Sequence, residues 1–125
     1  MNYPDNIEEI KKFAEEIKID VKYLLGEKYD GLLFLDSVKS LPENIVFNVD
    51  GSLILNSVRS LSANIVFNVG GNLNLSSVES LPDNIRFNVG GWLDLSSVKS
   101  LPSNTIFNVN KKVNFPYNHK VKVIW

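Results

Sequence analysis

The sequence of 125 residues contains no cysteine, and histidine and threonine occur only once each. Without cysteine there is no disulfide framework, no thiolate nucleophile and no sulfur ligand for a metal ion. Thr105 alone cannot supply the flat rows of threonine that an ice-binding face needs. His119 offers the only imidazole, and no nucleophile with an orienting base can be traced around it. We therefore expect no enzymatic activity, no cofactor and no bound metal.

Neither sign of charge dominates, since 13 basic and 14 acidic residues leave a net charge of −1. This balance argues against general binding to polyanions and against an acidic mimic of DNA. The N-terminus lacks the basic and then apolar order of a signal peptide, and no apolar run approaches the ~18 residues of a membrane span. The sequence predicts one soluble domain inside the cell.

What the chain has in abundance is internal repetition with a period of 20 residues. Eleven of the 20 columns are identical in four successive copies. Such self-similarity is typical of a solenoid, in which each unit buries its hydrophobic face only against its neighbours. The copies are 31–50 (GLLFLDSVKSLPENIVFNVD), 51–70 (GSLILNSVRSLSANIVFNVG), 71–90 (GNLNLSSVESLPDNIRFNVG) and 91–110 (GWLDLSSVKSLPSNTIFNVN).

Within each copy, apolar and polar residues alternate with period two, which favours half-buried strands over helices. Glycines and Ser-Leu-Pro segments separate the two strands of a copy as turns. The pattern predicts a mainly β fold, a β-solenoid of about four or five coils with ~20 residues in each. The columns expected to point inward begin at Leu33, Leu35, Val38, Leu41, Ile45, Phe47 and Val49.

Two asparagine columns and one glycine column are also identical in every copy. The columns that begin at Asn44 and Asn48 are expected to form ladders of stacked amides or to satisfy backbone groups in turns. The column that begins at Gly31 is expected to need a positive φ, or the room that a corner requires.

The two ends of the chain depart from the repeat. Apolar residues at helical spacing predict a helix from about residue 5 to about residue 19, and Asp5 and Glu8 have the spacing of a capping box. A helix before the first coil is expected to cap the open strand edge. The single domain then consists of a helical cap (1–30), four repeats (31–110) and a closing coil (111–125).

The repeated unit LPxNIxFNVGGxLxLSSVxS resembles two known groups of proteins, through its LxL pairs and through Leu41-Pro42, Leu81-Pro82 and Leu101-Pro102. One group is the short, 20-residue leucine-rich repeat of bacterial effectors, and the other is a loose group of phage and bacterial β-solenoid proteins. The usual leucine-rich unit has asparagine three residues after its LxL, where this chain has valine, and this difference favours a compact β-solenoid. The resemblance implies a protein-binding module, in one form a small inhibitor of a host protein such as a defence system.

Outward columns that vary between copies are where a binding surface is expected, because soluble monomers seldom expose contiguous apolar patches. The candidates for partner binding are Phe34, Val46, Ile54, Val66, Trp92 and Asp94. Three alternatives stay open for the apolar members: cover by the N-terminal helix, homodimerisation, or a foreign protein partner. Trp92 either acts as a binding hot spot or packs over Asp94 or the stem of Lys112.

The last 15 residues carry four bases and no acid: Lys111, Lys112, Lys120 and Lys122. Bases that alternate with aromatic residues can hold a nucleic-acid strand, whereas lysines at an exposed sheet end oppose edge-to-edge pairing. The favoured prediction is a non-enzymatic protein-binding module. The alternatives are a self-assembling structural protein and a nucleic-acid binder that uses this basic segment.

Overall fold

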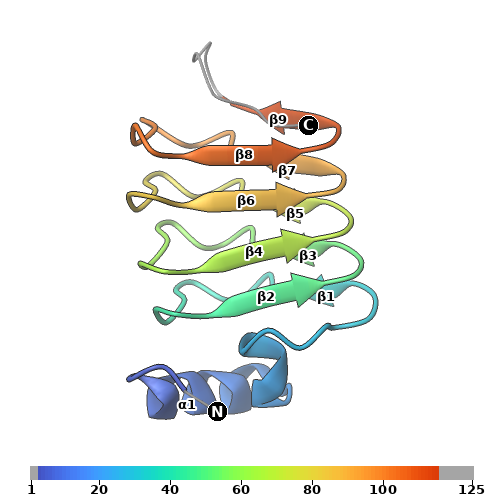
Figure 1. Ribbon diagram of the computed structural model, residues 1–125, viewed down its shortest axis with the longest axis vertical. Coiled ribbons are helices and arrows are strands. Elements are labelled where there is room, and N and C mark those ends of the chain that lie inside the picture. The colour runs from blue at the N-terminus through green and yellow to red at the C-terminus, as the bar shows by residue number, and fades with distance from the viewer. Residues whose placement is uncertain (1–2, 116–125) are drawn as a thin grey trace.

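The computed structural model describes residues 3–115, in which turns connect an N-terminal α-helix, a short 3-10 helix and the strands of two parallel β-sheets (Figure 1). The chain coils about four times, which confirms the predicted mainly β solenoid with a preceding helix. The first sheet, here the FNV sheet, contains β2 (Val46–Val49), β4 (Val66–Val69), β6 (Arg86–Val89) and β8 (Ile106–Val109). The second, the LxL sheet, contains β1 (Leu33–Phe34), β3 (Leu53–Ile54), β5 (Leu73–Asn74), β7 (Trp92–Asp94) and β9 (Lys112–Asn114).

The register of both sheets equals the period of the sequence. Phe47 pairs with Phe67, which pairs with Phe87, and all of these strands run parallel. In the LxL sheet Leu33 pairs with Leu53 in the same way. Because each strand lies beside the strand 20 residues later, equivalent side chains from successive coils lie next to one another.

The core lies between the two sheets and consists of the columns that the sequence predicts to point inward. All seven predicted members of the first coil are buried, with exposed fractions of 8% or less. At its centre four phenylalanine rings stack along the solenoid axis, with centroids 5.5–5.7 Å apart and planes 9–18° apart. These rings belong to Phe47, Phe67, Phe87 and Phe107. Phe115 closes the stack with an edge-on contact to Phe107, at 5.4 Å.

The asparagine column that begins at Asn44 and the glycine column that begins at Gly31 both lie in turns, but their backbone conformations differ. Asn44, Asn64 and Asn84 have left-handed backbone, with φ between 61° and 68°. Asparagine adopts this conformation more readily than most residues, so the turn itself explains the first three members of this column. Asn104, the fourth member, does not have a positive φ. In the glycine column only Gly31 has a positive φ, of 90°, so the expectation of a positive φ is wrong for the later copies.

Room at the corner is what the later glycines supply. A Cβ on Gly91 would lie 3.0 Å from the carbonyl oxygen of Gly71 in the preceding coil. A Cβ on Gly51 would lie 2.7 Å from the backbone of Gly31. Neighbouring coils therefore approach so closely at this corner that a side chain would force them apart.

Helix α1 (Ile7–Ile17) lies at the N-terminal end of the solenoid rather than along its side (Figure 1). Ile10, Phe13 and Ala14 bury its apolar face in the core, continuous with the first coil. The predicted Asp5 capping box is wrong, since the N-cap residue is Asn6. Its amide donates to the carbonyl of Glu43 at 2.9 Å and accepts from the Asn44 amide at 3.0 Å. The helix thus begins where it can bond to the first coil.

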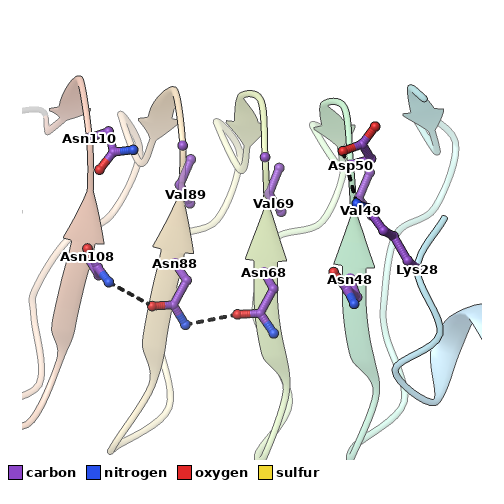
Figure 2. Close-up of a pocket in the computed structure, with 12 residues that line it drawn as sticks. Lys28, Asn48, Val49, Asp50, Asn68, Val69, Asn88, Val89, Asn108 and Asn110 are labelled. Carbon is purple, nitrogen blue, oxygen red and sulfur yellow. Dashed lines mark hydrogen bonds and ion pairs between the residues drawn. The ribbon is translucent and has the colours of Figure 1, made fainter. Parts of the chain in front are cut away.

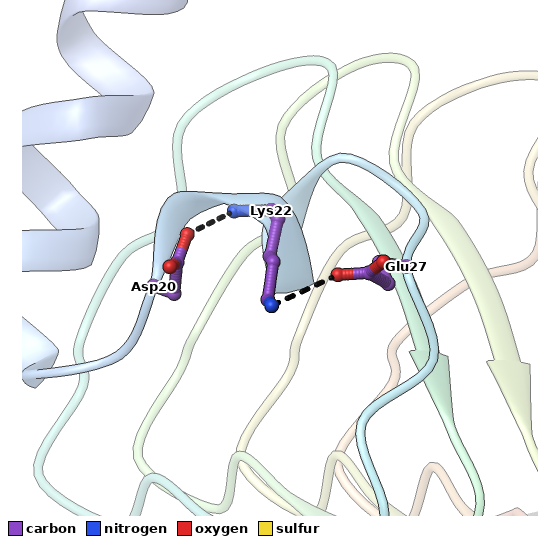
Figure 3. A network of polar contacts seen from close by, with 3 residues as sticks. All are labelled: Asp20, Lys22 and Glu27. Atoms are coloured by element: carbon purple, nitrogen blue, oxygen red, sulfur yellow. Dashed lines mark hydrogen bonds and ion pairs between the residues drawn. The ribbon is translucent and has the colours of Figure 1, made fainter.

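A short 3-10 helix, η1 (Val21–Leu24), joins α1 to the first coil (Figure 3). A carboxylate oxygen of Asp20 accepts a hydrogen bond from the backbone N–H of Lys22 at 3.0 Å, which caps this turn. The Lys22 ammonium lies 3.4 Å from the Glu27 carboxylate. Its hydrogen bond to Glu27, and then the charge of Glu27, raise the pKa of Lys22. Within residues 3–115 no helix has the length and apolar character needed to cross a membrane.

Candidate binding surfaces

The outer face of the LxL sheet carries the most exposed apolar residues of the solenoid coils. Leu32 and Phe34 are each 57% exposed, and the Cα register places Ile54 directly beside Phe34 in the next coil. Alternation explains the exposure, because Leu33 and Leu35 point into the core and force their neighbours outward. We call Leu32, Phe34 and Ile54 the apolar patch.

The apolar patch has an acidic border. Asp30 lies two residues before Leu32 and Asp36 two residues after Phe34, and both carboxylates are exposed. Within residues 3–115 neither carboxylate forms an ion pair. The patch therefore presents an apolar centre with negative charge on either side.

Leu32 is the member of the patch that the sequence reasoning left out. It begins a variable outward column whose later members include Ser52, Asn72 and Trp92. This variability between copies, which selects Trp92 as a candidate, selects Leu32 in the same column as well.

Trp92 and Asp94 lie on the same sheet but apart from the patch. Their strand, β7, is separated from β3 by β5, and the outward residues of that coil are Asn72, just before β5, and Asn74 within it. Trp92 is 57% exposed, and its backbone N–H donates to the Asn72 side-chain oxygen at 2.8 Å. A carboxylate oxygen of Asp94 accepts from the Ser96 N–H at 3.0 Å, as the Asn74 amide oxygen does from Ser76. Asp94 therefore has a local role in its turn.

Val46 and Val66 lie on the FNV sheet, so the six predicted binding residues belong to two different faces. The two valines are register partners, and Val66 is 39% exposed. Val46 is half-buried, with Leu25 paired alongside it as an isolated bridge. Val46 is thus covered by the segment that follows η1, and not by α1.

A groove of about 380 Å³ runs along the FNV sheet across all four coils (Figure 2). Its floor is a column of four asparagines: Asn48, Asn68, Asn88 and Asn108. Gly70 and Gly90, which have no side chains, also line it in the middle coils. Asp50, paired with Lys28 at 3.5 Å, and Asn110 lie at its two ends. We call this hollow the FNV groove.

The floor of the FNV groove is a hydrogen-bonded ladder, as the sequence predicts for this column. The Asn108 amide donates to the Asn88 oxygen at 3.2 Å, and the Asn88 amide donates to the Asn68 oxygen at 3.0 Å. Asn48 instead donates to the carbonyl of Gly26 at 3.3 Å. Side chains in such a ladder hold one another in a single orientation.

The basic candidates lie near the C-terminal end. Lys111 and Lys112 are exposed, and Lys112 is the register partner of Trp92. Lys120, Lys122 and His119 lie outside the described residues. Within residues 3–115 no group of three or more histidine or acidic side chains is arranged to hold a metal ion.

Comparison of the chain with protein-family models, with curated proteins and with solved structures finds no match. The fold and its outer faces are therefore the basis on which a function is proposed.

Proposed function

We propose that the chain is a non-enzymatic protein-binding module that contacts its partner through the apolar patch. The observation that carries this proposal is the exposure of Leu32 and Phe34, each 57%, beside Ile54 in the next coil. Large apolar side chains that gather on an otherwise polar face are characteristic of interaction sites. The same outward columns hold Ser52, Asn72 and Asn74 in the second and third coils.

The scaffold suits this role because it is already ordered before binding. The patch lies on paired strands above fully buried leucines, so little backbone freedom is lost when a partner docks. An aromatic residue at the centre of a small apolar area is a common source of binding energy.

The acidic border argues for a foreign partner rather than a second copy. Two copies that meet patch to patch would bring Asp30 and Asp36 of both chains toward the same interface. Like charges at an interface oppose association, whereas a partner with a basic rim would complement them. We expect a folded protein with an apolar pocket and surrounding lysine or arginine.

A more specific form of the proposal follows the resemblance to phage and bacterial repeat proteins. In that form the chain is a small intracellular inhibitor that masks a surface of a host protein, such as a component of a defence system. This step rests on analogy between repeat units.

The test is affinity capture from a host lysate with the wild type and with Ile54→Asp. The substitution should preserve the fold, because Asp94 occupies the equivalent position two coils later. The matched control is Asn74→Asp, which adds the same charge to the same column between them. We expect the wild type and the control to recover the same protein, at the same molar ratio of captured protein to bait. We expect Ile54→Asp to recover none of it.

Light scattering on the same three proteins separates the foreign partner from a second copy. A wild type that is monomeric agrees with the proposal. A wild-type dimer that Ile54→Asp converts to a monomer, with no other protein recovered, would replace the proposal with self-assembly.

A further inference from the structure

A hollow of about 320 Å³ lies on the turns that follow the LxL sheet, across the first three coils. Its lining contains two cations and no acid, and consists of Lys39, Asn56, Ser57, Arg59 and Ser77. We call it the basic hollow. It shares no residue with the apolar patch or with the FNV groove, so it is a third and separate feature of the surface.

The basic hollow lies where a backbone ladder of the turns is interrupted. In the later coils the Glu79 N–H donates to the Arg59 carbonyl at 2.7 Å, and the Lys99 N–H donates to the Glu79 carbonyl at 3.1 Å. Within residues 3–115 the equivalent bond, from the Arg59 N–H to the Lys39 carbonyl, is absent. The Arg59 N–H therefore has no backbone partner beside the hollow that this residue lines.

The two cations of the basic hollow have no carboxylate partner among the described residues. Lys39 and Arg59 are equivalent residues of adjacent coils, so two like charges lie next to each other, which is unfavourable. The next two members of this column, Glu79 and Lys99, form an ion pair at 3.1 Å. No ion pair within residues 3–115 involves Lys39 or Arg59. An anion between them would replace the repulsion by attraction.

Asn56 adds an amide to the lining at a cost to the fold. Its side-chain oxygen is buried and has no hydrogen-bond partner among the described residues. Such an oxygen destabilises a protein, and the equivalent residues of the next two coils are the smaller Ser76 and Ser96. Residues that break a local rule without a gain in stability concentrate at functional sites. The Asn56 amide is therefore better explained by a ligand than by the turn.

We propose that the basic hollow binds a phosphate group between Lys39 and Arg59. A phosphate carries a charge of about −1.5 to −2 at neutral pH, which matches two unpaired cations, whereas a carboxylate would neutralise only one of them. The Arg59 guanidinium can donate to two phosphate oxygens at once. The Arg59 backbone N–H and the Asn56 amide N–H are further donors.

The other side chains near the hollow do not oppose an anion there. The hydroxyls of Ser57 and Ser77 each donate to a backbone carbonyl of the preceding coil, which holds the coils together around the hollow. Asp36 precedes Asn56 in its column but does not line the hollow. Glu79, next to Arg59 in its column, has its carboxylate on the Lys99 ammonium.

This inference goes beyond the proposed function, because the basic hollow and the apolar patch have no residue in common. Loss of one site should leave the other intact, so each can fail separately.

The test is an NMR titration with inorganic phosphate at constant pH and ionic strength, followed at the Arg59 backbone N–H and the Asn56 side-chain amide. Both signals should shift and saturate, with a dissociation constant on the order of 1 mM. Acetate, which carries one charge, should bind at least about fivefold more weakly. Methyl phosphate distinguishes the source of the group. If it binds more tightly than inorganic phosphate, the group belongs to a larger ligand, and the reverse order assigns the free ion.

The repeat itself supplies variants that should keep the fold. Arg59→Glu copies Glu79 in the same column, so the new carboxylate should pair with Lys39 and abolish phosphate binding. Asn56→Ser copies Ser76 and should weaken binding about threefold to tenfold while the protein stays at least as stable as the wild type. The matched control is Lys112→Glu, which changes the net charge as much as Arg59→Glu does but on the LxL sheet, and it should leave binding unchanged.

Three results would each overturn the inference. The first is the absence of a saturating shift with both phosphate and methyl phosphate. The second is equal binding of acetate and phosphate. The third is phosphate binding that Arg59→Glu leaves unchanged, or weakens no more than Lys112→Glu does, in variants whose circular dichroism shows an intact fold.

Discussion

Replacement of Phe87 by alanine should remove a large share of the stability of the solenoid. The ring is fully buried, and it stacks on Phe67 at 5.6 Å and on Phe107 at 5.5 Å. A buried phenylalanine that is truncated to alanine costs about 3–5 kcal/mol. Each lost ring pair costs about 0.5–1.5 kcal/mol beyond its buried area. We therefore expect a loss of about 5 kcal/mol in the free energy of unfolding.

The size of this effect comes from the position of the ring within the stack. Phe47 is equally buried, but Phe67 is its only neighbour in the stack of parallel rings. Phe47→Ala should therefore cost about 1 kcal/mol less than Phe87→Ala. Arg86→Ala, one residue away on the outer face, should stay within about 0.5 kcal/mol of the wild type.

Urea unfolding followed by far-UV circular dichroism measures all three variants. A domain of this size has about 5–15 kcal/mol of stability, so Phe87→Ala should keep between almost none and about 10 kcal/mol of it in water. If Phe87→Ala stayed within 1 kcal/mol of Arg86→Ala, the phenylalanine stack could not be the centre of the core, and the reasoning would be refuted.

Three further predictions concern the turns and the N-terminal cap. Asn64→Ala should lose about 1 kcal/mol in urea unfolding because its φ is 61°, whereas Asn64→Gly should lose almost nothing; equal losses would contradict the turn argument. Gly90→Ala should cost about 1–3 kcal/mol, seen as a lower melting temperature, because its Cβ meets a backbone oxygen at 2.2 Å. Glu27→Gln should lower the raised pKa of Lys22, which an NMR titration of its side chain would detect. Folding raises the pKa of Lys22, so its charged form stabilises the folded protein fully at pH values below the ordinary pKa of 10.5. This contribution to the free energy of unfolding is lost as the pH rises through the raised pKa of the folded state. The wild type and Glu27→Gln should therefore become equally stable at alkaline pH.

The repeat allowed the coil, the strands and the inward columns to be predicted because identical columns meet identical surroundings in each copy. Phe47 and its equivalents are examples, since alternation and β propensity agree at those positions. Identity between the copies does not show why a column contains asparagine, and the two asparagine columns have different reasons. Asn44 is required by a left-handed backbone and Asn48 lies in the amide column, and both columns are equally invariant within the chain.

Contacts distant in sequence account for what could not be predicted. Asp5 fits a local capping rule, but Asn6 occupies the N-cap position, and its side-chain amide bonds to the first coil instead of to the helix. The outward residues were recognised individually, yet their division between two sheets depends on the turn between the two strands of one coil, such as β1 and β2. For that reason Phe34 and Val46, predicted as one surface, lie on separate faces.

The most direct test of the proposed function is photochemical cross-linking from the apolar patch in living host cells. A benzophenone-bearing phenylalanine replaces Phe34, which is 57% exposed, and a control carries it in place of the exposed Arg86 on the FNV sheet. The account predicts one covalent adduct with a foreign protein from position 34, none from position 86, and loss of the adduct when Ile54→Asp is added. No adduct, equal adducts from both positions, or an adduct only with a second copy of this chain would contradict it.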